Sequence, residues 1–224
     1  MNSANSLSPY RLYLVISTKD CPHLDYFNII EIALKNGFTC LQLREKQLST
    51  RDFIELSSKV KEISRKHNIP LFINDRIDVA LAIGATGVHL GQSDLPYSMA
   101  REISGHQLKI GVTLESTTDY QKHQYDLVDY FGLSAIYPSK TKQNCKPFWK
   151  EKNILQIKSK TPLIGIGGIT TENAQETLKM GFDGIALVSD ICSSTSLHEV
   201  KSKSQLFKHY LKDRDRCYSV NLTL

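Results

Sequence analysis

The stretch Gly165-Ile166-Gly167-Gly168-Ile169, followed later by Gly184-Ile185-Ala186-Leu187-Val188-Ser189-Asp190, decides the fold. Each segment is an apolar run that ends in small residues and leads into a predicted helix. Backbone N–H groups near a helix N-terminus bind anions, and glycine lets an anion approach the backbone closely. In a (β/α)8 barrel the loops after strands seven and eight commonly form a phosphate site. One such segment alone is equally typical of a tight strand–helix turn, but the ordered pair indicates a barrel with a phosphorylated ligand.

The rest of the chain alternates short apolar runs with longer amphipathic segments. The predicted strands are Leu12–Ser17, Cys40–Arg44, Leu71–Asn74, Gly87–Leu90, Lys109–Val112, Tyr130–Ala135, Leu163–Gly167 and Gly184–Val188. The predicted helices include Tyr26–Asn36, Thr50–His67, Arg76–Ile83 and Thr171–Met180. Alternation without hairpin turns predicts a parallel sheet, and eight strands are enough to close a barrel. A doubly wound sheet is the alternative.

The length of 224 residues suits one α/β barrel domain. We expect a disordered tail over residues 1–10, the (β/α)8 TIM barrel over 11–212 and a second tail over 213–224. A last helix is expected over Ser204–Lys212, with its basic residues on a solvated face.

Composition excludes several classes of protein. The sequence has no apolar run of the roughly 18–20 residues that cross a membrane, and its N-terminus has no basic region before an apolar core, so we expect no membrane partner and no secretory signal. Five cysteines without a Cys-x-x-Cys pair argue against a disulfide framework or a zinc site, so a reducing cytoplasm is the expected setting. The net charge of +5 suits small anionic ligands, while the lack of an aromatic stripe among the basic residues argues against nucleic acid. A homo-oligomer stays open.

Polar side chains follow the second predicted strand. Strand alternation puts Gln42, Arg44 and Lys46 on one side and Leu41 and Leu43 on the other. Polar residues at the C-terminal end of a barrel strand point toward the catalytic mouth. The planar fork of an arginine and the point charge of a lysine together suit a diphosphate. The alternative is a surface ion pair with Glu45.

Two aspartates follow the next two strands. Asp75 and Asp94 would lie at the same edge of the sheet, close enough to share one cation. Mg²⁺ prefers one or two carboxylates, with water and substrate phosphates completing its shell. Helix capping alone would explain either aspartate. Between them, His89 is better explained as a hydrogen-bonded structural residue than as a general base.

A second polar segment follows the sixth predicted strand. Two hydroxyls and two lysines occur together in Ser139-Lys140-Thr141-Lys142. At the end of a barrel strand such a group would grip an anion. An ordinary polar loop is the alternative.

Taken together, these segments resemble the thiamine-phosphate synthase family from Leu12 to about Ile191. The motifs that carry the resemblance are Gln42-Leu-Arg-Glu-Lys46, Phe72-Ile-Asn-Asp75, Gly87-Val-His-Leu-Gly-Gln-Ser-Asp94, Pro138-Ser-Lys-Thr-Lys142, Gly165-Ile-Gly-Gly-Ile169 and Val188-Ser189. Each motif alone is modest, but six in the right order are specific. The resemblance implies a (β/α)8 barrel that joins a hydroxymethylpyrimidine diphosphate to a thiazole phosphate, in some members its carboxylated form, and releases pyrophosphate by a dissociative mechanism.

The resemblance also implies roles for individual residues. The pyrimidine diphosphate would be bound by Gln42, Leu43, Arg44, Glu45, Lys46, Asn74, Thr113 and Lys142. The catalytic residues that stabilise the departing pyrophosphate would be Arg44, Lys46 and Lys142, with Mg²⁺ on Asp75 and Asp94. The thiazole phosphate would be bound by Ser139, Lys140, Thr141, Gly168, Val188 and Ser189.

The chain departs from the family pattern after the fifth strand. Glu115 stands where the family has a histidine, and would repel an anion if it faced the mouth. Two rival hypotheses follow. A related thiazole tautomerase uses that histidine and tends to lose the diphosphate and metal residues, so this chain does not fit it well. A catalytically weak binding protein of the same pathway is the second rival.

Overall fold

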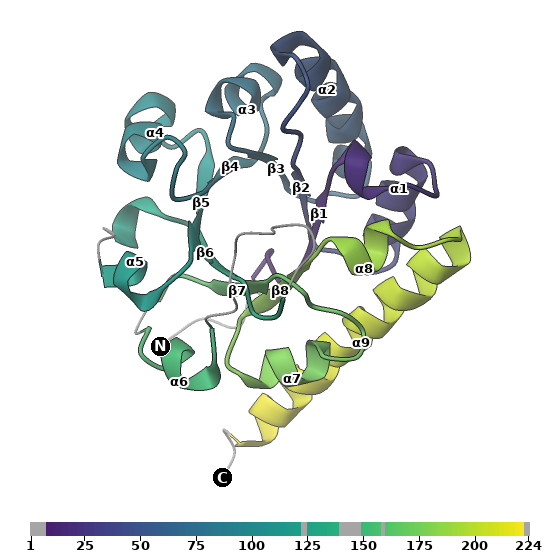
Figure 1. The fold of residues 1–224 in the computed structure, drawn as a ribbon, viewed down its shortest axis with the longest axis vertical. Coiled ribbons are helices and arrows are strands. Elements are labelled where there is room, and N and C mark those ends of the chain that lie inside the picture. The colour runs from purple at the N-terminus through teal and green to yellow at the C-terminus, as the bar shows by residue number, and fades with distance from the viewer. Residues whose placement is uncertain (1–7, 122–124, 139–148, 158–159, 222–224) are drawn as a thin grey trace.

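The eight predicted strands pair in chain order and close into a parallel barrel, and the helices form a ring outside it (Figure 1). The computed structural model describes residues 8–121, 125–138, 149–157 and 160–221. Closure is made by β1 (Leu12–Ile16) and β8 (Gly184–Leu187), with Leu12 opposite Ile185. The predicted (β/α)8 fold is confirmed, and the doubly wound sheet is wrong because its two edge strands would not pair.

The strand bounds lie close to those predicted from sequence. The other strands are β2 (Cys40–Leu43), β3 (Leu71–Asn74), β4 (Gly87–Leu90), β5 (Lys109–Leu114), β6 (Tyr130–Ser134) and β7 (Leu163–Ile166). The fifth strand is two residues longer than predicted, because Thr113 and Leu114 pair with Gly132 and Leu133.

Helices follow the strands around the ring. They are α1 (Tyr26–Lys35), α2 (Thr50–Lys66), α3 (Ile77–Ile83), α4 (Tyr97–Ser104), α5 (Thr117–Gln121), α6 (Glu151–Ile154), α7 (Ala174–Lys179), α8 (Ser189–Cys192) and α9 (Leu197–Asn221). Two 3-10 turns, η1 (Thr18–Asp20) and η2 (Tyr125–Leu127), complete the described elements.

The last helix is much longer than the predicted Ser204–Lys212, and it continues through the expected boundary at residue 212. Figure 1 shows α9 running along the outside of the barrel past α1, α8 and α7. Beyond residue 212, Asp215 pairs with the buried Arg11, and Arg214 donates to the carbonyls of Phe182 and Asp183. These contacts with segments distant in sequence hold a polar stretch that has little helical amphipathicity of its own.

The apolar residues form two cores. The larger lies between the barrel and its helices, and the smaller fills the barrel, where it includes Tyr13, Phe72 and Tyr130. Two interior glycines make room for these rings. A Cβ on Gly87 would lie 2.4 Å from Phe72 Cε1, and one on Gly111 would lie 2.1 Å from Tyr130 Cζ. The floor of the barrel is therefore packed with aromatic rings beneath its open end.

A repeated polar bridge closes the opposite, N-terminal rim. The residue before each even-numbered strand has a side-chain oxygen that accepts from a backbone N–H at the start of the preceding strand. Its own backbone N–H donates in return to the carbonyl of that partner residue. These bridges join Thr39 to Leu12, Thr86 to Leu71, Asp129 to Ile110, and Asp183 to Leu163. They satisfy strand ends that have no further ladder partner.

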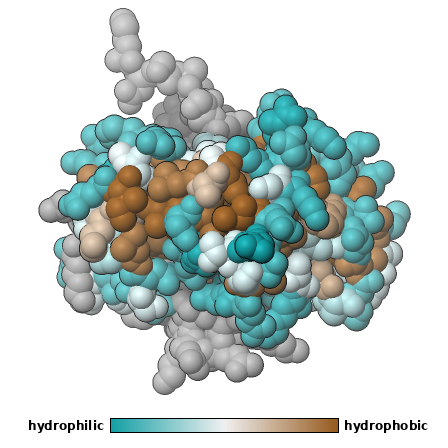
Figure 2. Space-filling model, turned by 90° about the horizontal axis from the view of Figure 1, so that it is seen from above, coloured by the Kyte–Doolittle hydropathy of each residue, from teal (hydrophilic) through white to brown (hydrophobic). Residues whose placement is uncertain are grey.

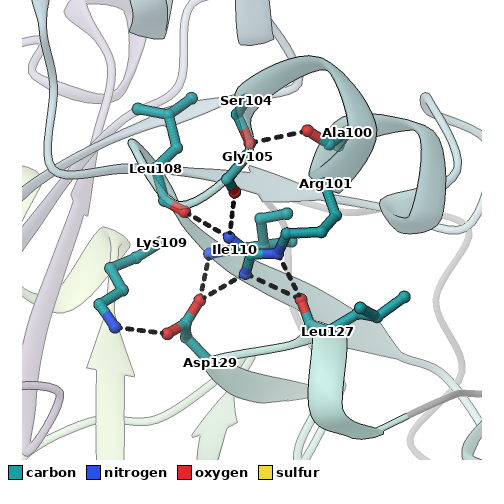
Figure 3. A network of polar contacts seen from close by, with 9 residues as sticks. All are labelled: Ala100, Arg101, Ser104, Gly105, Leu108, Lys109, Ile110, Leu127 and Asp129. Carbon is teal, nitrogen blue, oxygen red and sulfur yellow. Dashed lines mark hydrogen bonds and ion pairs between the residues drawn. The ribbon is translucent and has the colours of Figure 1, made fainter.

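The Asp129 bridge is the most elaborate, and Figure 3 shows its surroundings. Its carboxylate also accepts from Arg101 and Lys109, at 2.9 and 2.8 Å. The Arg101 guanidinium donates further to the carbonyls of Gly105, Leu108 and Leu127 (Figure 3). One ion cluster thus ties α4 and η2 to the starts of β5 and β6.

One outer face of the molecule carries an apolar patch. Figure 2 shows a brown patch on the side that carries α2, α3 and α4 at the top of Figure 1. Of the large apolar side chains that are exposed, Met99 and Ile103 belong to α4, and they are 48% and 55% exposed. Exposed apolar patches are typical of contact surfaces, and the homo-oligomer stays a prediction. Among the described helices, none combines the length and apolarity needed to cross a membrane.

Candidate active site

A cavity of about 390 Å³ opens at the C-terminal ends of the strands. The predicted site residues that line it are Gln42, Arg44, Lys46, Asn74, Asp75, Asp94, Thr113 and Val188. They come from five different strands or the loops that follow them, so the barrel brings together residues far apart in sequence. Polar groups of both charges share this space with apolar residues of β7 and β8, as in many small-molecule sites.

Strand alternation in β2 sorts the first motif as predicted. Gln42 and Arg44 line the cavity, whereas Leu43 is fully buried in the core between barrel and helices. The Glu45 side chain also turns away, and its two carboxylate oxygens accept from the Thr18 amide at 2.6 Å and the Thr18 hydroxyl at 3.2 Å. Leu43 and Glu45 are therefore outside the cavity, and only their backbone is available to a ligand there.

The ion pair that forms at the mouth is different from the surface pair considered above. Lys46 Nζ lies 3.3 Å from Asp75 Oδ2, while Glu45 is bound to Thr18. The alternative of an Arg44 or Lys46 pair with Glu45 is therefore wrong. Lys46 instead compensates part of the negative charge at the ends of β3 and β4.

The two aspartates do not cap helices. The N-cap residues of α3 and α4 are Arg76 and Pro96, and neither makes a side-chain cap. Asp94 Oδ2 instead accepts from the Gly91 amide at 2.7 Å, and Asp75 has a left-handed backbone with φ of 63°. Such a conformation is uncommon outside glycine, although aspartate and asparagine adopt it more readily than most residues.

The aspartates instead face each other. Burial, together with the hydrogen-bonded and negatively charged Asp94 carboxyl, raises the pKa of Asp75 to about 6, although Lys46 opposes the shift. Two carboxyls that share one space favour a proton or a cation between them. Within the described residues there is no cluster of three or more acidic, histidine or cysteine ligands, so a cation here would need water or ligand oxygens as well.

The two glycine-bearing segments lie side by side at the ends of β7 and β8. Gly168 has φ of 67°, and a Cβ there would lie 2.5 Å from the Pro138 carbonyl oxygen. The Thr171 amide donates to Asp190 Oδ2 at 3.2 Å and so joins the two loops. Val188 lines the cavity, while Gly168 and Ser189 are not among its lining residues. The remaining predicted residues of this half, Ser139, Lys140, Thr141 and Lys142, lie outside the described residues.

His89 is held by hydrogen bonds at both ring nitrogens, as expected for a structural histidine. Its Nδ1 lies 2.8 Å from the Tyr130 hydroxyl, and its Nε2 lies 2.8 Å from Thr113 Oγ1. The tyrosines Tyr13 and Tyr130 also line the cavity. Sequence reasoning did not include these two residues in the site. The signal was available, because strand alternation assigns Tyr13 and Tyr130 to the inner face of the barrel.

Glu115 also lines the cavity, at the end of β5. The sequence left its direction open, and the structure puts an acidic group in the mouth at the position for which the family resemblance implied a histidine. The described lining therefore contains Arg44 and Lys46 beside Asp75, Asp94 and Glu115.

Comparison with known proteins identifies the family of the chain. The family model described as thiamine monophosphate synthase matches residues 12–191. The chain is 42% identical over 205 residues to a thiamine-phosphate synthase of Clostridium acetobutylicum, covering 91% of this chain and 95% of the relative. It is 43% identical over 202 residues to the enzyme of that name from Methanobrevibacter smithii, covering 86% and 96%.

A solved structure extends the similarity to three dimensions. Thiamine phosphate pyrophosphorylase from Pyrococcus furiosus superposes with a TM-score of 0.83 at 28% identity, over 94% of this chain and 99% of that one. The fold and the relatives that match over nearly the full length agree with one another. The chain belongs to the thiamine monophosphate synthase family.

Proposed function

We propose that this protein is a thiamine-phosphate synthase, a transferase that joins 4-amino-2-methyl-5-(diphosphooxymethyl)pyrimidine to a thiazole phosphate and releases pyrophosphate. The observation that carries the proposal is the convergence of Arg44, Lys46, Asp75 and Asp94 on one cavity in a chain of this family. Such a mouth suits small phosphorylated substrates, because cationic side chains and one cation on the two aspartates would together neutralise a diphosphate.

The pyrimidine diphosphate is assigned to the β2–β5 side of the cavity. Its ligands there would be Gln42, Arg44, Lys46, Asn74 and Thr113, with the backbone of Leu43 and Glu45 alongside. Lys142, which follows β6 in the sequence, would be a further ligand. Arg44, Lys46 and Lys142 act as the catalytic cations, since their charges stabilise the pyrophosphate as it leaves.

Asp75 and Asp94 are the proposed magnesium ligands. The two carboxyl groups contact each other, and the pKa of Asp75 is raised. Both features are expected where two carboxylates lie together without a cation to neutralise them. Oxygen ligands and a shell open to substrate phosphates fit Mg²⁺. When bound, Mg²⁺ supplies positive charge to the diphosphate. The carboxylates would hold that charge at the ends of β3 and β4, and Lys46 Nζ lies 3.3 Å from Asp75 Oδ2.

The thiazole phosphate is assigned to the ends of β6, β7 and β8. Gly168, Val188 and Ser189 would bind it through backbone amides and the Ser189 hydroxyl, and Ser139, Lys140 and Thr141 would bind it as well. Both the plain and the carboxylated thiazole phosphate suit these groups.

The proposed mechanism is dissociative. The bond between the pyrimidine methylene carbon and the diphosphate oxygen breaks first, and the electron pair leaves with pyrophosphate. The electron-rich aminopyrimidine carries the resulting positive charge until the thiazole nitrogen attacks the methylene carbon. Such a reaction needs charge stabilisation and alignment of two substrates more than a nucleophilic side chain.

The direct test mixes the purified protein with both substrates and Mg²⁺ and follows thiamine phosphate by its fluorescence after oxidation to the thiochrome. We expect product that depends on Mg²⁺ and on both substrates. Binding of both substrates without product would support the rival of a catalytically weak binding protein, for which Glu115 in the cavity is the one favourable observation. Rearrangement of the thiazole phosphate alone would support the tautomerase.

A further inference from the structure

A continuous chain of hydrogen bonds crosses the barrel interior from β2 to β5. Gln42 Nε2 donates to the Tyr13 hydroxyl at 3.2 Å, and that hydroxyl lies 2.9 Å from the Tyr130 hydroxyl. Tyr130 and Thr113 then bind opposite nitrogens of His89, each at 2.8 Å. All five residues line the cavity, and each tyrosine is only 1% exposed. The chain thus joins two proposed ligands of the pyrimidine diphosphate, Gln42 and Thr113.

The chain has one direction. An amide nitrogen only donates, so the Tyr13 oxygen accepts from Gln42. The buried Tyr13 hydroxyl still needs an acceptor for its single hydrogen, and among the described residues the other oxygen hydrogen-bonded to it is that of Tyr130, 2.9 Å away, so we assign Tyr13 as the donor of this bond. The Tyr130 hydrogen then goes to His89 Nδ1, which leaves the histidine hydrogen on Nε2 to donate to Thr113 Oγ1. Burial keeps both phenols protonated by raising the pKa of Tyr13 and the pKa of Tyr130 well above the usual value.

The most important consequence concerns the Thr113 hydroxyl, at the end of the hydrogen-bond chain. Because Thr113 Oγ1 accepts from His89, its own hydrogen is left to donate into the cavity that Thr113 lines. A hydroxyl that donates is what an anionic diphosphate requires, and hydrogen bonds to charged groups are stronger than neutral ones. If His89 carried its hydrogen on Nδ1 instead, Thr113 would donate to Nε2 and would present a lone pair to the anion.

We propose that Tyr130 and His89 are positioning residues that fix the Thr113 hydroxyl as a hydrogen-bond donor to the diphosphate. This role rests on the proposed function, because the diphosphate is the group that Thr113 would bind. Tyr130 is the decisive member, since its hydroxyl passes the direction set at Gln42 to the imidazole of His89. Neighbouring hydrogen bonds in such a buried chain polarise one another, so one deletion changes the whole orientation.

The tautomer of His89 is the first measurement, and it needs no substrate. Long-range ¹H–¹⁵N spectra of labelled protein distinguish a hydrogen on Nδ1 from one on Nε2. The protein has seven histidines, and the His89 signals are identified by their loss in His89→Gln. We expect the Nε2–H form in the wild-type protein and a shift toward Nδ1–H in Tyr130→Phe. An Nδ1–H form in the wild-type protein would overturn the proposal whatever the enzyme does.

Calorimetric binding of inorganic pyrophosphate with Mg²⁺ is the second measurement. We expect Tyr130→Phe to weaken binding roughly 10-fold, the range for a hydrogen bond to a charged group. Tyr10→Phe is the matched control, because the Tyr10 ring packs against Tyr130 with centroids 4.5 Å apart but lies outside the chain. It removes a phenol hydroxyl from the same aromatic cluster and should leave binding unchanged.

A double-mutant cycle separates positioning from general damage. Thr113→Val should weaken pyrophosphate binding about as much as Tyr130→Phe, and Thr113→Ser should largely retain it, because serine keeps the hydroxyl. Adding Tyr130→Phe to Thr113→Val should cost nothing further, since the hydroxyl being oriented is already gone. Losses that simply add would overturn the positioning role.

Failure of this positioning role can be distinguished from failure of the proposed function. Mg²⁺-dependent synthesis of thiamine phosphate together with additive losses would leave the function standing and remove the positioning role. Non-additive losses in pyrophosphate binding, without any synthesis of thiamine phosphate, would support the positioning role and contradict the proposed function. A wild-type protein that does not bind pyrophosphate would contradict both.

Discussion

Polar side chains at the two ends of the barrel are used in opposite ways. At the N-terminal rim, Thr39, Thr86, Asp129 and Asp183 bind back onto strand ends. At the C-terminal mouth, Arg44, Lys46, Asp75 and Asp94 converge on a cavity instead. The rim satisfies the backbone of the fold, while the mouth keeps charges available to a ligand. Barrel enzymes in general divide stability and catalysis between these two faces.

The pKa values of Asp129 at the rim and Asp75 at the mouth show the difference between the two ends. Burial would raise the pKa of Asp129, but hydrogen bonds from Lys109 and the Ile110 amide outweigh it and lower that pKa. For Asp75, burial and Asp94 win over Lys46 and raise the pKa to about 6. The charged form of Asp129 is therefore stabilised by the fold, whereas the charged form of Asp75 is held at a cost that a bound cation would remove. The same substitution at each position should therefore have opposite consequences.

The largest effect is expected at the mouth. Asp75→Asn should lower kcat/KM for thiamine phosphate synthesis by about 10²–10³-fold, the scale on which loss of an electrostatic contact to the reacting group acts. Stability should hold or rise, because asparagine tolerates the φ of 63° and the repulsion with Asp94 disappears. The thiochrome assay and thermal unfolding without metal measure the two quantities. Wild-type turnover would remove Asp75 from the site.

The matched change at the rim should act on stability alone. Asp129→Asn removes the charge that Arg101 and Lys109 share, and we expect a loss of about 1–3 kcal/mol in the free energy of unfolding. Urea unfolding measures it. At a temperature well below the transition, kcat/KM should equal that of the wild-type protein. A large loss of turnover in a folded variant would break the division between the two ends.

The pH dependence of that loss sharpens the comparison. The pKa of Asp129 is lowered by folding, so its stabilising contribution is present above the unfolded pKa of about 3.9 and fades as pH falls through the lower folded value. The stability difference between the wild-type protein and Asp129→Asn should therefore shrink between about pH 5 and pH 3. A difference that stays constant over this range would mean that packing, rather than charge, accounts for the loss.

The smallest effect is expected at a neutral bridge. Thr86→Val leaves the Leu71 amide without the Thr86 Oγ1 acceptor that lies 3.1 Å away, and we expect a loss of about 1 kcal/mol. Thr86→Ser keeps the hydroxyl and is the control, again by urea unfolding. Wild-type stability in Thr86→Val together with a loss in Thr86→Ser would show that the methyl group, rather than the hydrogen bond, stabilises this part of the rim.

Much of the fold could be predicted because local pattern and tertiary role agree. Strands buried on both faces are continuous apolar runs, which is why the strand bounds from sequence lie within two residues of the observed ones. Strand alternation also sorted Gln42 from Leu43, since the side-chain period of two is a property of the backbone itself. The convergence of Asp75 and Asp94 followed from the same geometry, because adjacent parallel strands end at one edge.

The sequence by itself therefore determined the barrel, the order of its strands and the end at which the polar residues gather. Only the tertiary structure decided how those residues are used. Glu45 turned out to bind Thr18, Lys46 to pair with Asp75, and α9 to extend to contacts with Arg11. The partners in each case are separated along the chain, and a local pattern carries no record of a distant partner. The directed chain through Tyr130 arose in the same way, because five strands must close around one interior before their side chains can meet.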